Sequence, residues 1–222
     1  MRIGMLGAGR MGGKLGTVFA HAGHQVVFSY SRSEARLKSL ARNAKHEARA
    51  GTPREAAESD VVLLAVPWAQ LDDVLHQAGD LSGKVLITCS LPMKEDDTEL
   101  VIGHTSSGAE VVARKARGAR VVSAFSTIPS EVIDAVFRQR TKKGPRPNVL
   151  FGGDDARAKK VAADLIGDIG FDPLDVGPLK AARYLEPFTL LVGELAYGGS
   201  GSPAVAYRFE RFQEEELRDS RA

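Results

Sequence analysis

Cysteine is nearly absent from this chain, because Cys89 is the only one among 222 residues. A single cysteine excludes an internal disulfide and a zinc site built from thiolates, and it is typical of a reducing compartment. Cys89 stands late in a strand-like apolar run. We therefore expect a buried structural thiol.

Long hydrophobic runs are also absent, since none approaches the ~20 residues that a membrane-spanning helix requires. Met1 leads directly into a strand-like pattern, without the positively charged stretch that opens a secretory signal. These two observations predict a cytoplasmic protein that has no membrane partner.

An excess of charge of one sign is the third absence. The chain has 30 Lys and Arg against 28 Asp and Glu, a net charge of +2. Its positive residues are scattered along the sequence, which argues against a nucleic-acid partner. With 43% hydrophobic and 26% charged residues, the composition is that of an ordinary soluble globular protein. The length allows one large domain, or one domain with a smaller appendage.

A catalytic constellation is missing as well. The five histidines are dispersed without metal-ligand spacing, and no serine lies in a nucleophile elbow. We therefore predict no metal site and assign no catalytic residue. Hydride transfer needs no protein acid or base when the ring of the acceptor takes the charge, so the pattern favours chemistry that depends on positioning.

What the chain does contain is a regular alternation of strand-like and helix-like segments. Strands are expected at 2–6, 25–29, 47–50, 61–66, 84–89, 120–125 and 148–152, with helices between them, among them 33–44, 69–77, 130–138 and 155–168. Ser107 and Glu110 have the spacing of a capping box that opens another helix. This alternation predicts an α/β fold, a doubly wound Rossmann-type parallel sheet.

Beyond about residue 175 the pattern becomes helical. One face is expected to carry the apolar residues Leu185, Phe188, Leu191, Val192 and Leu195. This stripe is expected either to cover a ligand cleft or to serve core packing and dimerisation. We therefore predict a Rossmann domain over 1–176 and a small helical C-terminal cap over 177–222.

A glycine motif lies between the first strand and the first helix. Gly7, Gly9 and Gly12 match G-x-G-x-x-G in the context that this fingerprint requires. Gly7 permits the tight turn, Gly9 lets a pyrophosphate approach the backbone, and Gly12 lets the helix pack on the strand. Dinucleotide contacts are therefore expected from Gly7, Ala8, Gly9, Arg10, Met11 and Gly12.

The position that selects between NAD and NADP holds no acid. Ser31 and Arg32 lie 19 and 20 residues after Gly12, where a carboxylate would bind a free ribose 2′-hydroxyl. A guanidinium and a hydroxyl can instead hydrogen-bond a 2′-phosphate. We therefore predict NADP(H) as the cofactor of domain 1–176, with Arg36 as a second cation.

Proline follows three strand ends, at the sheet edge where ligands of doubly wound folds bind. The fourth strand ends at Val66, Pro67 and Trp68, which are expected to line the cofactor site. Ser90 and Ser126 follow the next two strands in similar settings. These two serines are expected to line the pocket of a second substrate.

Taken with these motifs, the chain resembles the family of coenzyme F420-dependent NADP oxidoreductases over about residues 1–195. The resemblance rests on Met1–Gly7, Ser31–Arg32, Ala65–Trp68, Val121–Pro129, Gly152–Asp155 and Leu174–Leu179. It implies a small NADP-binding Rossmann enzyme, commonly a homodimer, that passes a hydride between NADPH and the deazaflavin coenzyme F420. It also implies that Gly9, Ser31, Arg32, Pro67 and Trp68 contact NADP, and that Arg183 and Thr189 lie near the acceptor.

The acceptor half departs from the family pattern. Members that use the deazaflavin carry a histidine where this chain has Ser126 and a serine where it has Pro187. Two alternatives therefore stay open beside the deazaflavin reductase: an NADPH-dependent reductase of a flavin, a quinone or a small carbonyl compound, and a non-catalytic NADP-binding sensor. The chain also resembles the NADPH domain of metalloreductases that feed electrons to a flavin.

Overall fold

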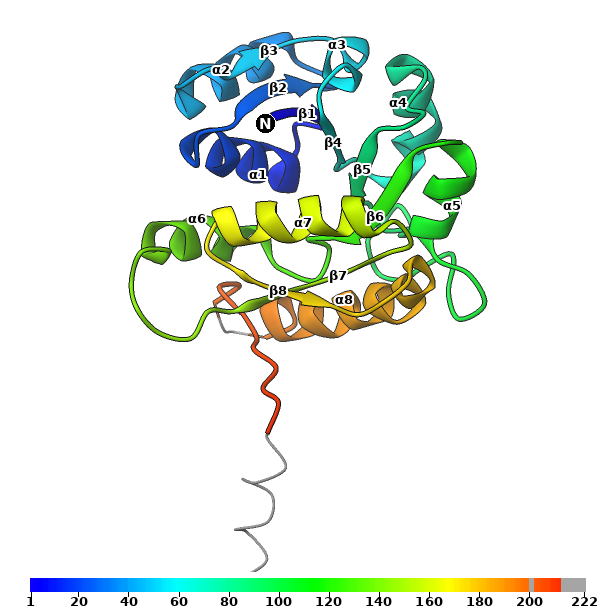
Figure 1. The fold of residues 1–222 in the computed structure, drawn as a ribbon. Coiled ribbons are helices and arrows are strands. Elements are labelled where there is room, and N and C mark those ends of the chain that lie inside the picture. Colours follow the sequence, from blue (N-terminus) through cyan, green and yellow to red (C-terminus); the bar gives the residue numbers. More distant parts are fainter. Residues whose placement is uncertain (200–201, 213–222) are drawn as a thin grey trace, which may run out of the picture.

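The computed structural model describes residues 1–199 and 202–212, and its centre is an eight-stranded sheet between layers of helices (Figure 1). The strands are β1 (Arg2–Leu6), β2 (Gln25–Ser29), β3 (Arg49–Ala50), β4 (Val61–Leu64), β5 (Val85–Thr88), β6 (Arg120–Ala124), β7 (Asn148–Gly153) and β8 (Asp172–Asp175). The helices are α1 (Arg10–His21), α2 (Glu34–Ala44), α3 (Pro53–Ala57), α4 (Leu71–Ala78), α5 (Gly108–Lys115), α6 (Ser130–Gln139), α7 (Ala156–Asp168) and α8 (Ala182–Tyr197). Two 3₁₀ helices, η1 (Trp68–Gln70) and η2 (Leu179–Ala181), precede α4 and α8.

The strand order is β3-β2-β1-β4-β5-β6-β7-β8, so the chain reverses its direction of travel across the sheet between β1 and β4. Every neighbouring pair is parallel except β6 and β7, which are antiparallel. The predicted fold class is therefore confirmed, with one antiparallel step inside an otherwise parallel sheet. In such sheets ligands bind outside the carboxyl ends of the strands at the point of reversal.

Successive residues of a strand point to opposite faces of the sheet, and each face has its own hydrophobic core. Ile3 and Met5 point to the face covered by α1, α6 and α7, whereas Leu6 points to the face covered by α3, α4 and α5. The same alternation runs through β4, where Leu63 faces the first core and Leu64 the second. Strands buried on both faces read as near-continuous apolar runs, which is why β4 is wholly apolar in the sequence.

Strand β8 was not expected from the sequence. Its residues Asp172–Asp175 include Pro173 and two acids, which do not indicate a strand. The strand forms at the edge of the sheet, where proline is tolerated because no neighbour on that side needs its missing N–H. Figure 1 shows α7 and α8 on opposite sides of β7 and β8, so this edge supports both helices.

The single apolar face expected on the last helix is wrong. Leu185 and Val192 are buried, whereas Leu191 and Leu195 are 55% and 66% exposed. Successive residues turn by about 100° around a helix axis, which puts Leu191 and Leu195 on a different side from Leu185. Tyr184 is exposed as well, so α8 presents an outward apolar strip next to its buried face.

The C-terminal segment returns to the sheet after α8. The backbone N–H of Asn148 donates to the carbonyl of Tyr207 at 2.8 Å, and the phenol of Tyr207 pairs with the hydroxyl of Thr127 at 2.5 Å. Residues 200–201 and 213–222 of the predicted cap lie outside the described part of the chain. The division at residues 176 and 177, between β8 and η2, stays a prediction.

We predict that Gly12→Ala destabilises the fold, whereas Gly13→Ala on the same helix stabilises it. A Cβ at Gly12 would lie 2.1 Å from the carbonyl oxygen of Gly7, but at Gly13 it would make ordinary contact with Leu40 at 3.4 Å. Overpacking costs about 1–3 kcal/mol, while alanine in a helix interior gains roughly 0.5–1 kcal/mol over glycine. Urea denaturation of both variants measures the free energies of unfolding, and equal changes would contradict the packing argument.

Candidate functional site

The three glycines of the turn after β1, Gly7, Gly9 and Gly12, differ in the space around them. Gly7 has φ +116°, and a Cβ there would lie 2.3 Å from the carbonyl oxygen of Ala65. A Cβ on Gly12 would lie 2.1 Å from the carbonyl oxygen of Gly7. At Gly9, however, a Cβ would meet nothing within 4 Å. Gly7 and Gly12 are therefore required by the packing of the turn, whereas the space at Gly9 is open for a ligand.

Helix α1 begins at this turn with free N–H groups. Gly9 is its N-cap and supplies no capping side chain, and no acid stands in the first turn. The first N–H groups of a helix lack internal partners and carry partial positive charge, so they attract an anion. The end of α1 thus fits the pyrophosphate of a dinucleotide.

A cavity of about 470 Å³ lies beyond the end of β2 and includes Ser31 and Arg32 in its lining. Within residues 1–199 and 202–212, the Arg32 guanidinium makes no hydrogen bond or ion pair. The hydroxyl of Ser31 accepts from the N–H of Ser33 at 3.2 Å and keeps its own proton free to donate. Both side chains can therefore serve a phosphate on the ribose 2′-oxygen.

Tyr30 and Asp73 close the same cavity from the other side. The Tyr30 hydroxyl donates to Asp73 Oδ2 at 2.6 Å, and Gln77 Nε2 donates to the same oxygen at 2.9 Å. Burial and the Asp73 carboxylate raise the pKa of Tyr30 to about 12, so this phenol stays protonated. None of these three residues was singled out in the sequence, because Asp73 and Gln77 converge on Tyr30 only through the packing of α4.

Arg36 is placed differently from the other predicted cofactor residues. Its Nε donates to the carbonyl of Ala8 at 2.7 Å, so it ties the first turn of α2 to the glycine turn. This contact uses one donor of the guanidinium and leaves its other N–H groups available. The predicted role as a second cation for the phosphate stays untested.

A second cavity, of about 390 Å³, lies at the ends of β4 and β5. Val66, Pro67, Trp68 and Ser90 all line it, together with Met11. Ser90 is buried and joins the two strand ends, because its hydroxyl accepts from the N–H of Val66 at 3.1 Å and donates to the carbonyl of Leu64 at 3.5 Å. The structure thus gathers the predicted residues of two separate loops around one space.

Cys89 is only partly buried and lines this cavity beside Ser90, so the prediction of a buried structural thiol is wrong. Burial raises the pKa of its thiol to about 12, so the thiol stays protonated at neutral pH and is a poor nucleophile. In the described part of the chain, no group of three or more His, Cys, Asp and Glu side chains could hold a metal ion.

A third cavity, of about 240 Å³, adjoins the second through Met11, which lines both. Ser126 and Thr189 meet here, although they lie 63 residues apart in the chain. The Thr189 hydroxyl donates to the carbonyl of Leu185 at 2.9 Å, and its lone pairs remain free. The other lining residues are Arg10, Ile128, Pro129, Ser130, Val192, Gly193 and Tyr197.

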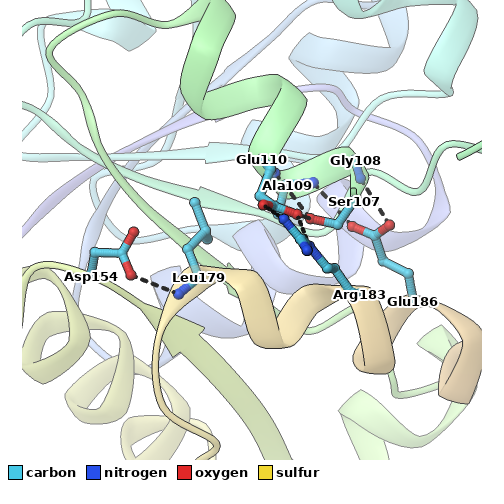
Figure 2. A network of polar contacts seen from close by, with 8 residues as sticks. All are labelled: Ser107, Gly108, Ala109, Glu110, Asp154, Leu179, Arg183 and Glu186. Carbon is cyan, nitrogen blue, oxygen red and sulfur yellow. Dashed lines mark hydrogen bonds and ion pairs between the residues drawn. The ribbon is translucent and has the colours of Figure 1, made fainter. Parts of the chain in front are cut away.

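Arg183 does not line any of these three cavities. Figure 2 shows its guanidinium against Glu110 of α5, with Nε 2.8 Å from Oε2 and a terminal nitrogen 2.6 Å from Oε1. The predicted capping box of α5 is therefore only half formed. Ser107 accepts from the N–H of Glu110 as expected, but the Glu110 carboxylate turns to Arg183 instead of to the Ser107 backbone.

Glu186 stands at the same junction and was not found in the sequence. It is 2% exposed, and its carboxylate accepts from the N–H groups of Gly108 at 2.8 Å and Ala109 at 3.0 Å (Figure 2). Burial raises the pKa of this carboxyl to about 7, against the two N–H groups, which lower it. A glutamate inside an otherwise helical pattern resembles any surface acid, so no sequence signal could have indicated it.

The described residues form a Rossmann-type fold with cavities along the ends of its strands. Residues 2–92 match the family model described as coenzyme F420-dependent NADP oxidoreductase. The resemblance predicted from the sequence is confirmed over these residues.

Two further proteins cover most of the chain. A structure from Arthrobacter sp. FB24, described as a candidate F420-dependent NADP reductase, has a TM-score of 0.82 and 24% identity, with 95% of this chain and 100% of that chain covered. Rat metalloreductase STEAP3 is 29% identical over 192 residues, which are 85% of this chain. This alignment spans 36% of the rat protein, about a third of its length.

More distant structures share the fold. A reductive aminase from Aspergillus terreus, solved with NADPH and ethyl levulinate, has a TM-score of 0.64 and 19% identity, covering 88% of this chain and 61% of that one. Of the helices in residues 1–199, none is long and apolar enough to cross a membrane. Which residues of this chain contact a ligand stays a prediction throughout.

We predict that Gly9→Val abolishes dinucleotide binding while the protein stays folded. The added side chain would enter open space in the structure, so it costs little packing, but it would fill the space that a pyrophosphate needs. Titration with NADPH, followed by the fluorescence of Trp68, measures binding, and circular dichroism is the control for folding. Retained NADPH affinity would place the cofactor elsewhere.

Proposed function

We propose that this protein transfers a hydride between NADPH and coenzyme F420, with the acceptor bound in the cavity between Ser126 and Thr189. One observation carries the proposal: the cavities follow the carboxyl edge of the sheet from Arg32, past the glycine turn, to Ser126. Arg32 would hold the 2′-phosphate of a dinucleotide along this edge, and the N–H groups at the start of α1 would hold its pyrophosphate. Pro67 and Trp68 would line the space for its nicotinamide.

NADPH would give a hydride to the deazaflavin and become NADP⁺, and the reduced deazaflavin would take its proton from water. The protein supplies the relative placement of the two rings. Met11 lies between the nicotinamide cavity and the acceptor cavity, so the two rings can meet beside its side chain. Holding two reactants in contact accounts for about 7–11 kcal/mol of a barrier. The linings of the two cavities include the neutral side chains of Ser90, Cys89 and Thr189. They also include the charged side chains of Arg10, Lys94, Glu95 and Asp97, and the transfer that we propose assigns no acid or base role to any of them.

The assembly that we propose is a homodimer in the cytoplasm. Tyr184, Leu191 and Leu195 form an exposed apolar strip on α8, with 76%, 55% and 66% of their surfaces accessible. Large apolar side chains gathered on one surface favour association. A second copy of this chain would cover the strip without closing the acceptor cavity, whose lining lies on another side of α8.

Anaerobic oxidation of NADPH against a panel of acceptors tests the proposed reaction. The panel contains coenzyme F420, FMN, a soluble quinone and a small carbonyl compound, each with protein-free controls. Turnover with F420 above the other three supports the proposal. Turnover with only one of the other acceptors would indicate an NADPH-dependent reductase of that acceptor. Binding of NADPH without any turnover would indicate a non-catalytic NADP-binding sensor.

We predict that Arg32→Ala weakens NADP binding by roughly ten- to a hundredfold, because one charge-assisted hydrogen bond to phosphate is worth ~1.5–3 kcal/mol. NAD lacks the 2′-phosphate, so its affinity should barely change. Calorimetry with both dinucleotides, on wild type and variant, measures the two effects. Equal affinity of the wild type for NAD and NADP would contradict the assignment of Ser31 and Arg32.

A further inference from the structure

The acceptor cavity is built from two parts of the fold. One wall belongs to the Rossmann domain and includes Arg10 and Ser126, and the other wall is α8, with Thr189, Gly193 and Tyr197. The width of the cavity therefore depends on how α8 is held against the domain. Buried apolar residues of α8, among them Leu185 and Val192, hold it against the domain, and polar contacts at both ends of the helix add to this packing.

Glu186 makes the most buried of these contacts. Each of its two carboxylate oxygens accepts one backbone N–H from the first turn of α5, at 2.8 and 3.0 Å. Two parallel hydrogen bonds from fixed backbone donors define a direction as well as a distance. They fix α8 both along its axis and in its rotation.

Gly108, whose N–H group donates to Glu186, lies where a larger residue would not fit. A Cβ on Gly108 would lie 2.8 Å from Cδ of Pro92 and 3.3 Å from Oε1 of Glu186. Glycine is therefore needed where the carboxylate approaches the backbone. Arg183 adds a second tie one turn earlier on α8, through its bidentate pair with Glu110.

Because α8 is a helix, the position of Glu186 determines the positions of the α8 residues that line the cavity. Thr189 and Gly193 follow Glu186 by three and seven residues, which puts all three on one side of α8. At about 1.5 Å per residue, Thr189 lies only some 4.5 Å further along the axis. At the far end, the Tyr197 hydroxyl donates to Glu131 of α6 at 2.8 Å, so α8 is tied to the domain on both sides of the cavity.

We propose that Glu186 is a positioning residue for the acceptor, because its buried carboxylate on the first turn of α5 sets where Thr189 and Gly193 stand in the cavity. This inference rests on the proposed function, which makes that cavity the acceptor site. The cofactor cavities at Arg32 and Trp68 contain no residue of α8. Glu186 therefore acts on the acceptor and leaves NADPH binding alone.

The test compares Glu186→Gln with Glu194→Gln, the same change at an exposed position of the same helix. In the first variant an amide NH₂ faces a backbone N–H, so one of the two hydrogen bonds is lost. We expect a roughly ten- to hundredfold lower kcat/KM for F420, or for FMN if that is the acceptor, mostly through KM. NADPH affinity, measured by Trp68 fluorescence, should stay within about twofold because the sites are separate.

A second variant keeps the inference testable if Glu186→Gln does not fold. Glu186→Asp keeps the carboxylate but withdraws it by one methylene from the N–H groups of Gly108 and Ala109, and we expect the same selective rise in the KM of the acceptor. Wild-type kinetics in Glu186→Gln would overturn the proposal. So would a parallel loss of NADPH and acceptor binding, because it would indicate general unfolding.

Hydrogen–deuterium exchange separates the failure of this inference from the failure of the proposed function. If the wild type reduces no acceptor, the proposed function fails, and exchange alone decides the inference. The inference is supported if exchange over residues 188–197 becomes faster relative to α1 in Glu186→Gln, while Glu194→Gln shows no such change. Unchanged exchange in α8 overturns it.

Discussion

The close approach of three backbone segments at the glycine turn is the constraint on which the rest of the molecule depends. Gly7 lies under the carbonyl of Ala65, and Gly12 lies over the carbonyl of Gly7. These contacts bring the end of β1, the start of α1 and the end of β4 within van der Waals distance at the reversal of the sheet. No side chain larger than hydrogen fits at either glycine, so the free N–H groups of α1 open directly onto the strand ends.

From that point the site is assembled by short segments that follow different strands. The segment after β2 supplies Ser31 and Arg32, the segment after β4 supplies Pro67 and Trp68, and the segment after β6 supplies Ser126. Parallel strands deliver their carboxyl ends to one edge, so distant parts of the chain meet there without long loops. This series ends at β6, because β7 runs antiparallel to it.

The C-terminal helix completes the candidate site in a different way, through polar contacts instead of strand pairing. Glu186 and Arg183 bind the start of α5, and Asp154 Oδ1 accepts from the backbone N–H of Leu179 at 2.9 Å, just before α8 (Figure 2). Glu186 is the buried carboxylate of this set, and a displacement of α8 would leave it without its two N–H partners, which favours a single arrangement of α8 and α5.

The sequence by itself determined the α/β fold, the glycine turn and the positions that follow β2, β4 and β6, because each depends on neighbours close in the chain. Period, turn chemistry and spacing within one strand–turn–helix unit are local properties. The edge strand β8, the split face of α8, the pairing of Arg183 with Glu110 and the burial of Glu186 were decided only by the tertiary structure. Each of these joins residues that are far apart in the chain or depends on which side of an element meets a partner. Glu186 and Glu194 lie on the same helix, and only the packing of α5 against the first of them makes one a buried anchor and leaves the other in solvent.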